Sequence, residues 1–173
     1  IGGGPIGMLI AMVARHAGAK KVVISEISEY RRKIAEELGF VAVNPLDADF
    51  DEQIADLTQA KGFDVCFEVS GSKPGIKTAV EKAKITGTVM IVGMTSEPHP
   101  VDLSAVFAKE LTIKGVRIHS QYNFIGAVEL LKEGTINDQF ASMISKVYAL
   151  EDLEEAFAFA QVPGDYFKIL IEM

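Results

Sequence analysis

The opening seven residues, IGGGPIG, constrain the fold more than any other stretch of the chain. Gly2, Gly4 and Gly7 have the G-x-G-x-x-G spacing of a dinucleotide-binding turn. In such a turn the first glycine permits a tight bend, the second lets a pyrophosphate approach the backbone, and the third lets the following helix pack closely on the sheet. The spacing therefore predicts a phosphate-binding turn between a strand and a helix.

The residues after this turn read as an apolar helix that runs from Met8 and stops at Gly18. One of its faces carries four apolar side chains, those of Ile6, Leu9, Ile10 and Val13. Pro5 suits the first helical position, because its missing N–H would be unpaired there anyway. The free N–H groups from Ile6 onward then face an anion, which the helix dipole also favours.

A buried strand is predicted next, and it ends in the acid Glu26. Glu26 lies 19 residues after Gly7 (26 − 7), close to the spacing of about 20 expected for a ribose-binding carboxylate. A carboxylate accepts a hydrogen bond from a 2′-hydroxyl but repels a 2′-phosphate, so NAD is favoured over NADP. Arg31 weakens this preference, because a nearby arginine can accommodate the phosphate.

Strands and helices alternate along the rest of the chain. Further strands are predicted at residues 40–43, 63–69, 87–93, 111–116, 144–148 and 167–171. Helices are predicted at residues 28–38, 49–60, 76–83, 122–132 and from 150 onward. This alternation predicts parallel βαβ units and an α/β fold with a doubly wound parallel sheet of the Rossmann type. The first strand is largely missing apart from Ile1, so we expect the chain to be a fragment of a longer polypeptide.

Two structural expectations follow from this fold. The carboxyl ends of parallel strands share one rim, so Glu26, residues 69–71 and residues 92–94 should line a single crevice. In the helix at 122–132, three apolar side chains are expected to face inward: Phe124, Val128 and Leu131.

Composition and charge narrow the class of partner. The net charge of −7 argues against nucleic acid or an anionic membrane as partner, and no apolar run approaches the ~20 residues needed to span a bilayer.

The single cysteine, Cys66, leaves no internal disulfide and no multi-cysteine metal site within this chain. A buried structural thiol in a reducing cytoplasm fits best. Three histidines lie too far apart for zinc spacing, and His99, between two prolines, reads as solvated.

A family resemblance emerges from the ordered motifs of the whole chain. They are the glycine turn, Glu26 with Arg31, FEVSG at 67–71, VGM at 92–94, KGV at 114–116, residues 150–157 and KILI at 168–171. Together they resemble the cofactor half of the medium-chain zinc-dependent alcohol dehydrogenases, and within these the polyol, butanediol and threonine dehydrogenases. The resemblance implies a dinucleotide-binding domain at 1–118. It also implies a C-terminal segment at 119–173 that completes this domain and leads back to an absent catalytic domain with the zinc ligands and proton relay.

The resemblance also implies cofactor-binding roles along the chain. Gly2, Gly4, Pro5, Ile6 and Gly7 would form the turn that binds the pyrophosphate. Glu26 and Arg31 would lie beside the adenosine ribose, and Val69 and Gly71 beside the adenine. Val92, Gly93 and Met94 pass under the nicotinamide, the backbone of Val116, Arg117 and Ile118 holds the carboxamide, and Lys168 lies near the pyrophosphate. Neither a catalytic residue nor a metal ligand is assigned within this chain.

The substrate and the assembly are implied less directly. Sorbitol dehydrogenases carry an arginine–tyrosine pair where this chain has Ile118 and His119. A smaller secondary alcohol or diol is therefore as good a candidate substrate as a polyol, and His119 is a speculative substrate contact. The resemblance implies a homodimer or homotetramer that pairs two cofactor domains edge to edge through residues 101–111.

Three alternatives use a similar glycine turn. An FAD-binding domain suits the turn and the later acid, and an S-adenosylmethionine-binding domain also has an acid after its second strand. A non-catalytic NAD-binding module is the third. An FAD-binding domain is disfavoured because parallel units continue to Gly93 with no inserted antiparallel segment. An S-adenosylmethionine-binding domain is disfavoured by the third glycine, Gly7, and by the strand that ends at Val92 and Gly93.

Overall fold

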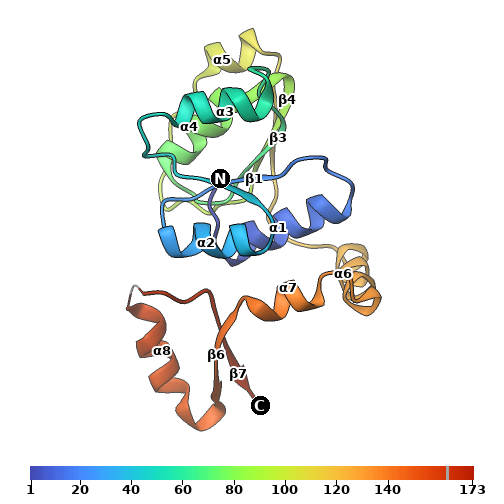
Figure 1. The fold of residues 1–173 in the computed structure, drawn as a ribbon, viewed down its shortest axis with the longest axis vertical. Coiled ribbons are helices and arrows are strands. Elements are labelled where there is room, and N and C mark those ends of the chain that lie inside the picture. Colours follow the sequence, from blue (N-terminus) through green and yellow to red (C-terminus); the bar gives the residue numbers. More distant parts are fainter. Residues whose placement is uncertain (163) are drawn as a thin grey trace. The chain divides into compact units, whose positions relative to one another are not determined.

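The computed structural model describes residues 1–162 and 164–173. They form two units, Ile1–Ile118 and His119–Met173, which alternate helices with strands (Figure 1). Every strand pair is parallel, so the predicted α/β class with parallel sheets is confirmed. That the second unit completes a cofactor domain stays a prediction.

Unit 1 carries helices on both faces of its strands. Its elements are α1 (Pro5–His16), β1 (Val23–Ser25), α2 (Glu29–Glu37), β2 (Val41–Val43), α3 (Phe50–Thr58), β3 (Phe63–Glu68), α4 (Lys73–Lys82), β4 (Ala83–Ile91), α5 (Leu103–Ala108) and β5 (Thr112–Gly115). Helices α1 and α2 lie on one side of the strands, and α3, α4 and α5 on the other (Figure 1). This is the layering of a doubly wound fold.

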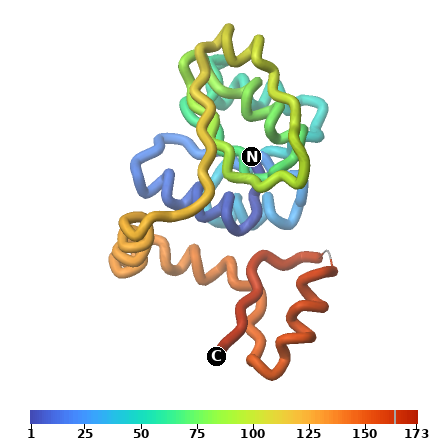
Figure 2. The backbone as a smooth tube through the Cα atoms, turned by 180° about the vertical axis from the view of Figure 1, so that it is seen from behind, coloured from blue at the N-terminus to red at the C-terminus, as the bar shows by residue number. Residues whose placement is uncertain are grey.

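The strands of unit 1 form two blocks that the first two residues join. One block is β1–β2 and the other is β3–β4–β5. The Ile1 amino group donates to the Phe67 carbonyl at 2.7 Å, and the Val69 N–H donates to the Ile1 carbonyl at 2.9 Å. On the other side, the Gly2 N–H donates to the Ser25 carbonyl at 2.8 Å. The resulting order is β2, β1, Ile1–Gly2, β3, β4, β5, which is the order of a dinucleotide-binding sheet, and Figure 2 shows the N-terminal residue in the middle of this unit.

Apolar side chains from α3 and α4 fill the space against the sheet. Under α4 the buried cluster is Cys66, Ala79, Ala83 and Val89, and under α3 it is Val43, Phe50 and Ile54. Cys66 is 6% exposed, so the predicted buried thiol is confirmed. Its burial raises the pKa of the thiol to about 11.

Helix α1 buries a different face from the one its most apolar residues define. Met8, Ala11 and Met12 are buried, whereas Ile6 and Val13 are 60% and 45% exposed. The reason lies at Gly7, where an added Cβ would overlap the Gly2 carbonyl oxygen. This close approach fixes the rotation of the helix, so the residues beside and one turn after Gly7 face the strands.

Two elements of unit 1 begin earlier than predicted. Helix α4 begins at Lys73, because the Ser72 hydroxyl accepts from the Gly75 N–H at 3.0 Å and caps it. Strand β4 begins at Ala83, which pairs with Phe63. The register then shifts, and Thr86 adopts a φ of 59° within the strand, an irregularity that the alternation of apolar residues does not reveal.

Unit 2 is a smaller α/β unit. It contains α6 (Gln121–Glu133), α7 (Asn137–Ser142), β6 (Ile144–Ala149), the 3₁₀ turn η1 (Leu150–Asp152), α8 (Leu153–Gln161) and β7 (Lys168–Glu172). The inward orientation expected for α6 is wrong for Phe124 and Leu131, which are 59% and 40% exposed, whereas Val128 is half-buried. The unit has one pair of strands and short helices, which gives this long helix no layer to cover its apolar side. In residues 1–162 and 164–173, no helix combines the length and apolar character needed to cross a membrane.

Candidate functional site

The glycine turn has the shape that the spacing predicts. Gly2 has a φ of +94°, a conformation that favours glycine. A side chain at Gly7 would overlap the Gly2 carbonyl oxygen, so this position also requires glycine. A Cβ at Gly4 would meet only the Arg31 guanidinium, at 3.8 Å. The turn therefore leaves room in front of Gly4, where a ligand could approach the backbone.

The first turn of α1 presents backbone donors at this place. Gly4 is the N-cap residue and Pro5 occupies the first position, and no side chain of the described residues caps this end. The first hydrogen bond of the helix runs from the Met8 N–H to the Gly4 carbonyl at 2.9 Å. The N–H groups of Ile6 and Gly7 precede that bond and extend from the helix end. Such an end attracts an anion through its free donors and its dipole.

Glu26 lies at the mouth of the glycine turn. Its carboxylate accepts from the Gly3 N–H at 2.7 Å and from the Ser28 N–H at 2.9 Å. The Arg31 guanidinium lies 3.9 Å from the same carboxylate. With only 6% of its surface exposed, Glu26 is held in one orientation, yet each carboxylate oxygen has capacity for a further donor.

The other predicted segments of unit 1 follow along the same edge of the sheet. A Cβ on Gly2 would lie 3.0 Å from the Ser70 nitrogen. A Cβ on Gly71 would overlap the Met94 carbonyl oxygen, and one on Gly93 would overlap the Gly71 nitrogen. Backbone thus meets backbone from the glycine turn to the ends of β3 and β4, so the structure brings these three segments together.

Apolar side chains stand exposed along this edge. Met94 is 89%, Ile118 77% and Val116 45% exposed, and the Val116 N–H donates to the Ile91 carbonyl at 2.9 Å. Ile27, directly after Glu26, is 64% exposed and was not assigned a role from sequence. The sequence signal that could have located Ile27 is its position, as an apolar residue directly after an acid that ends a strand. Exposed apolar groups beside polar donors are typical of a ligand site.

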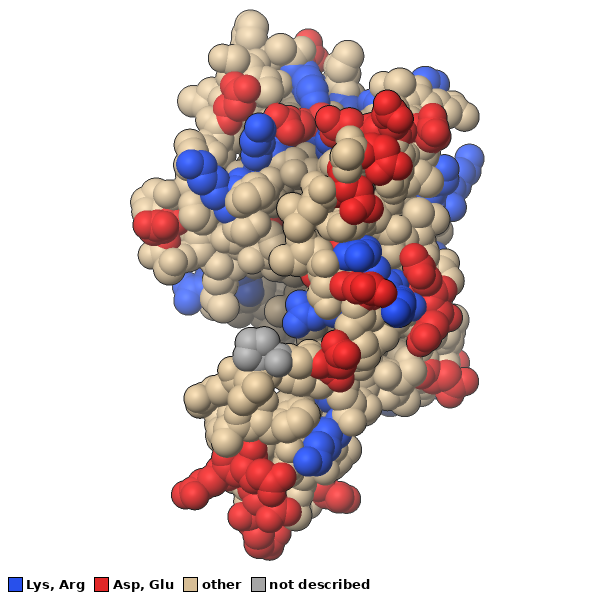
Figure 3. Space-filling view, turned by 60° about the vertical axis from the view of Figure 1, so that its left-hand side comes forward, with Lys and Arg blue, Asp and Glu red and all other residues tan. Residues whose placement is uncertain are grey.

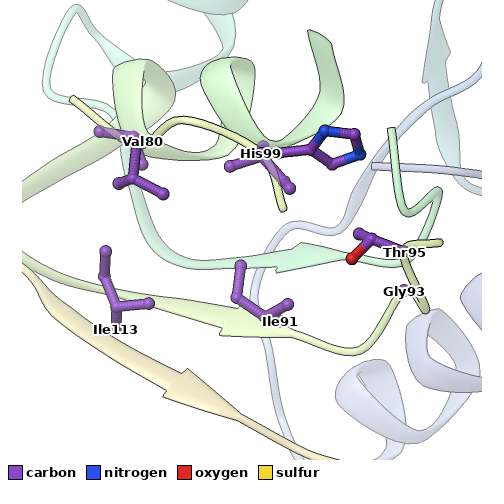
Figure 4. Close-up of a pocket in the computed structure, with 8 residues that line it drawn as sticks. Val80, Ile91, Gly93, Thr95, His99 and Ile113 are labelled. Atoms are coloured by element: carbon purple, nitrogen blue, oxygen red, sulfur yellow. The ribbon is translucent and has the colours of Figure 1, made fainter. Parts of the chain in front are cut away.

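A cavity of about 230 Å³ lies between α4 and the strands beside this edge. Figure 4 shows Val80 of α4 facing Ile91 and Ile113 of two neighbouring strands, with Thr95 and His99 at the loop side. His99, expected to be solvated, is instead half-buried where it lines this cavity.

Two predicted site residues belong to unit 2. His119 is exposed, and its ring lies 6.0 Å from the Phe124 ring. Lys168 begins β7, has an exposed side chain, and its N–H donates to the Met143 carbonyl at 3.0 Å. Acidic side chains gather where η1 leads into α8 (Figure 3), namely Glu151, Asp152, Glu154 and Glu155. His119 and Lys168 thus both have contacts with other residues of unit 2.

Comparison with known proteins agrees with the geometry of unit 1. The model of the family described as zinc-binding dehydrogenase matches residues 5–133. The chain is 40% identical to 2-dehydro-3-deoxy-L-galactonate 5-dehydrogenase of Pseudoalteromonas atlantica over 99% of the chain and 50% of that protein. It therefore spans about half the length of this relative.

Solved structures show the same similarity. 2R,3R-butanediol dehydrogenase from Bacillus subtilis is 32% identical with a TM-score of 0.87, over 99% of the chain and 49% of that protein. A Sinorhizobium meliloti protein bound to NADP is 27% identical with a TM-score of 0.85, over 99% and 51%. The chain thus shares both sequence and fold with about half the length of each of these relatives.

Proposed function

The chain belongs to the zinc-binding dehydrogenase family, and from this premise we propose that it is the NAD-binding portion of an alcohol or polyol dehydrogenase. The observation that carries the proposal is the glycine turn with Glu26 at its mouth. Backbone donors at the start of α1 and a carboxylate at the mouth of the same turn suit an adenosine diphosphate group, which needs donors for its phosphates and acceptors for its ribose.

The residues of unit 1 fit NAD. The space in front of Gly4 and the N–H groups of Ile6 and Gly7 suit the pyrophosphate. Glu26 would accept from the ribose hydroxyls of the adenosine and repel a 2′-phosphate, which supports NAD. Arg31 would lie beside that ribose and the phosphates.

Further roles are proposed for the remaining predicted residues. Val69 and Gly71 would flank the adenine side together with the exposed Ile27. The nicotinamide side would comprise Val92, Gly93 and Met94, with the backbone of Val116, Arg117 and Ile118 holding the carboxamide. Lys168 is proposed for the pyrophosphate and His119 for the substrate.

When bound, NAD supplies the nicotinamide ring that exchanges a hydride with the alcohol carbon. The residues of this chain would bind and orient it: the turn would hold the pyrophosphate, Glu26 the ribose, and the strand ends the rings. Zinc does not fit the described residues, since no group of three or more His, Cys, Asp or Glu side chains among them could hold a metal ion. We assign zinc, as the resemblance implies, to the intact enzyme only.

We propose a secondary alcohol, diol or polyol as substrate of the intact protein. Two similar proteins carry names that specify a sugar acid and a butanediol, both of which have secondary hydroxyl groups. Ile118 and His119 stand where a polyol-specific pair is expected from the resemblance, so the smaller substrates are the first to assay.

We further propose a homodimer or homotetramer that pairs unit 1 through its sheet edge. Strand β5 contacts β4 on one side and no other strand of the described residues on its other side. On α5, the helix that precedes β5, Leu103 and Phe107 are 73% and 85% exposed. An unpaired edge next to exposed apolar side chains supports association through a second copy.

Ligand titration of the purified chain tests the cofactor. NADH should bind at least about tenfold more tightly than NADPH, and FAD and S-adenosylmethionine should not compete with it. Glu26→Gln should narrow the NADH preference, because it removes the charge that repels a phosphate. If the chain binds FAD or S-adenosylmethionine but not NADH, it is not the NAD-binding portion of a dehydrogenase. If it binds NADPH more tightly than NADH, its cofactor is NADP.

A further inference from the structure

A second carboxylate, that of Glu68, is buried beside the crevice and has no role in the proposed binding of NAD. Glu68 is the last residue of β3 and is 0% exposed. Among the described residues, no lysine or arginine side chain forms a salt bridge with it. The Ile1 amino group interacts with it electrostatically, without a hydrogen bond to it among the described residues. A buried carboxylate also requires hydrogen bonds, so its hydrogen-bond partners reveal what holds it there.

All of those partners belong to the turn that follows β3. The carboxylate accepts from the Ser70 N–H at 2.9 Å and from the Gly71 N–H at 3.1 Å to each of its oxygens. The Ser70 hydroxyl also donates to it. The side chain therefore folds back over its own strand end and fixes the two residues that follow Val69.

The main chain of Glu68 fixes the neighbouring strand end as well. Its carbonyl accepts from the Val92 N–H at 2.8 Å and from the Gly93 N–H at 2.9 Å. A Cβ on Gly93 would lie 2.8 Å from the Glu68 carboxylate, and one on Gly75 would lie 2.7 Å from it. Gly93 and Gly75 thus approach the carboxylate more closely than residues with a side chain could.

The residues held in this way are those proposed to contact the cofactor. Gly71 and Val69 form the adenine side, and Val92 and Gly93 form the nicotinamide side. The Ser70 backbone also lies against the glycine turn, since its nitrogen is 3.0 Å from the position of a Cβ on Gly2. Glu68 is too buried to touch a ligand, so any influence on binding has to act through these backbone segments.

We propose that Glu68 is a positioning residue: its carboxylate fixes the turn after β3 in place beside the end of β4, which the Glu68 main-chain carbonyl holds, and so sets the shape in which the crevice holds its ligand. The identity of that ligand as NAD rests on the function proposed above. The tie between the two strand ends is a property of the chain with or without ligand, which allows the two ideas to be tested separately.

The test compares Glu68→Gln with Val89→Ala in the same chain. Glutamine keeps the shape but replaces one acceptor oxygen with an NH₂ group that opposes the Gly71 N–H. Val89 is 0% exposed in the middle of β4, so its truncation lowers stability without touching the strand ends. Both variants are measured well below their unfolding temperatures for amide hydrogen exchange and for NADH binding. The chain has no tryptophan, so nicotinamide fluorescence is read without indole emission.

We expect the Ser70 and Gly71 amides to exchange faster in Glu68→Gln, with NADH affinity lower by about tenfold and a smaller shift of nicotinamide emission on binding. Val89→Ala should lower the unfolding temperature and leave exchange at these amides and NADH affinity within about twofold. Ser70→Ala removes only the hydrogen bond from the hydroxyl group. Its amide exchange rates and NADH affinity should lie between those of wild type and Glu68→Gln, and it replaces Glu68→Gln in the test if the glutamine variant does not fold.

Unchanged exchange at Ser70 and Gly71 in Glu68→Gln would overturn the proposal, and so would faster exchange with unchanged NADH affinity. Equal losses of affinity in Glu68→Gln and Val89→Ala would reduce Glu68 to a purely structural residue. A wild-type chain that fails to bind NADH would instead overturn the proposed function, while the exchange data would still decide whether Glu68 holds the turn.

Discussion

At the scale of single residues, Gly7 controls whether the glycine turn can form. A methyl group there would overlap the Gly2 carbonyl oxygen. We expect Gly7→Ala to lower the free energy of unfolding by about 1–3 kcal/mol through overpacking and to weaken NADH binding, because the turn has to open to admit the methyl group. Chemical denaturation and NADH titration measure the two effects.

Gly126→Ala is the matched control for this substitution. Gly126 lies within α6, and a Cβ there meets nothing within 4 Å. The same change should therefore raise helix stability by up to about 1 kcal/mol and leave NADH binding unaltered. A Gly7→Ala chain as stable as wild type would show that the turn tolerates the side chain.

The thiol of Cys66 predicts how stability depends on pH. Burial raises its pKa from an ordinary 9.0 to about 11. Between these values the unfolded chain releases the proton while the folded chain keeps it, so stability is full below pH 9 and falls as the pH rises towards 11. The loss amounts to about 3 kcal/mol over this window, at roughly 1.4 kcal/mol for each unit of pKa difference. Urea unfolding between pH 8 and 10.5 measures it.

Cys66→Ala isolates this contribution from that of lysines and tyrosines, which titrate in the same range. The variant is less stable at pH 8 because it leaves a small cavity, but its stability should fall less steeply above pH 9. Parallel pH profiles for the two proteins would mean that the thiol ionises as easily in the folded state as in the unfolded one.

Which single residues could be predicted from sequence depends on how local their role is. Gly2, Gly7 and Glu26 occupy fixed offsets within one motif, so spacing alone located them. Ile27 and Glu68 lie outside that motif, so its spacing does not locate them. The Glu68 carboxylate bonds to residues only two and three positions later, but its place beside the end of β4 comes from strand pairing that is distant in sequence. The half-buried position of His99 likewise arises from α4 and the strands that it meets.

At the scale of secondary-structure elements, Lys109 joins α5 to the end of α4. Its ammonium group donates to the Glu81 carbonyl at 2.7 Å and to the Val80 and Ala83 carbonyls at 3.2 and 3.1 Å. These carbonyls have no partner within the helix, and a cation there is favoured by the helix dipole. We expect Lys109→Met to lower the free energy of unfolding by about 1–3 kcal/mol.

Lys77→Met serves as the control, because Lys77 lies within α4, the helix whose end the Lys109 ammonium group contacts. The Lys77 side chain is 73% exposed, and among the described residues its salt-bridge partner is Glu81 at 3.6 Å. Its loss should change stability by less than about 0.5 kcal/mol. Equal effects of the two substitutions in thermal unfolding would show that the Lys109 ammonium contributes no more than a surface charge.

Helix periodicity located the elements better than it oriented them. The apolar stripe of α1 was found, but the contact at Gly7 turns Met8 and Ala11 inward instead. The stripe of α6 was also found, yet Phe124 is exposed because unit 2 has no layer to cover it. Periodicity reports that a face is apolar, and only the tertiary structure determines what covers it.

At the scale of the whole molecule, the fold class could be predicted because parallel βαβ units leave a regular alternation in the sequence. The order of the strands was fixed by hydrogen bonds that Ile1 and Gly2 make on both sides. Short-range patterns do not contain such long-range pairs, and neither do they contain α7, whose six residues carry no apolar periodicity. The same limit applies to association between chains, which depends on surfaces that no motif describes.

The proposed association is tested by substitutions on α5. Phe107 is 85% exposed on α5, the helix that precedes β5, whose outer edge pairs with no other strand of the described residues. A stable interface needs about 800 Å² from each partner. A buried carboxylate without a partner opposes association, so Phe107→Asp should convert the protein to a species half as large or smaller, down to the 18.7 kDa chain. Leu46→Asp changes an equally exposed residue, 76%, away from that edge and should leave the mass unaltered. Sedimentation velocity distinguishes the two. A wild-type chain that is monomeric at high concentration, or a Phe107→Asp protein that keeps its full mass, would place any interface elsewhere.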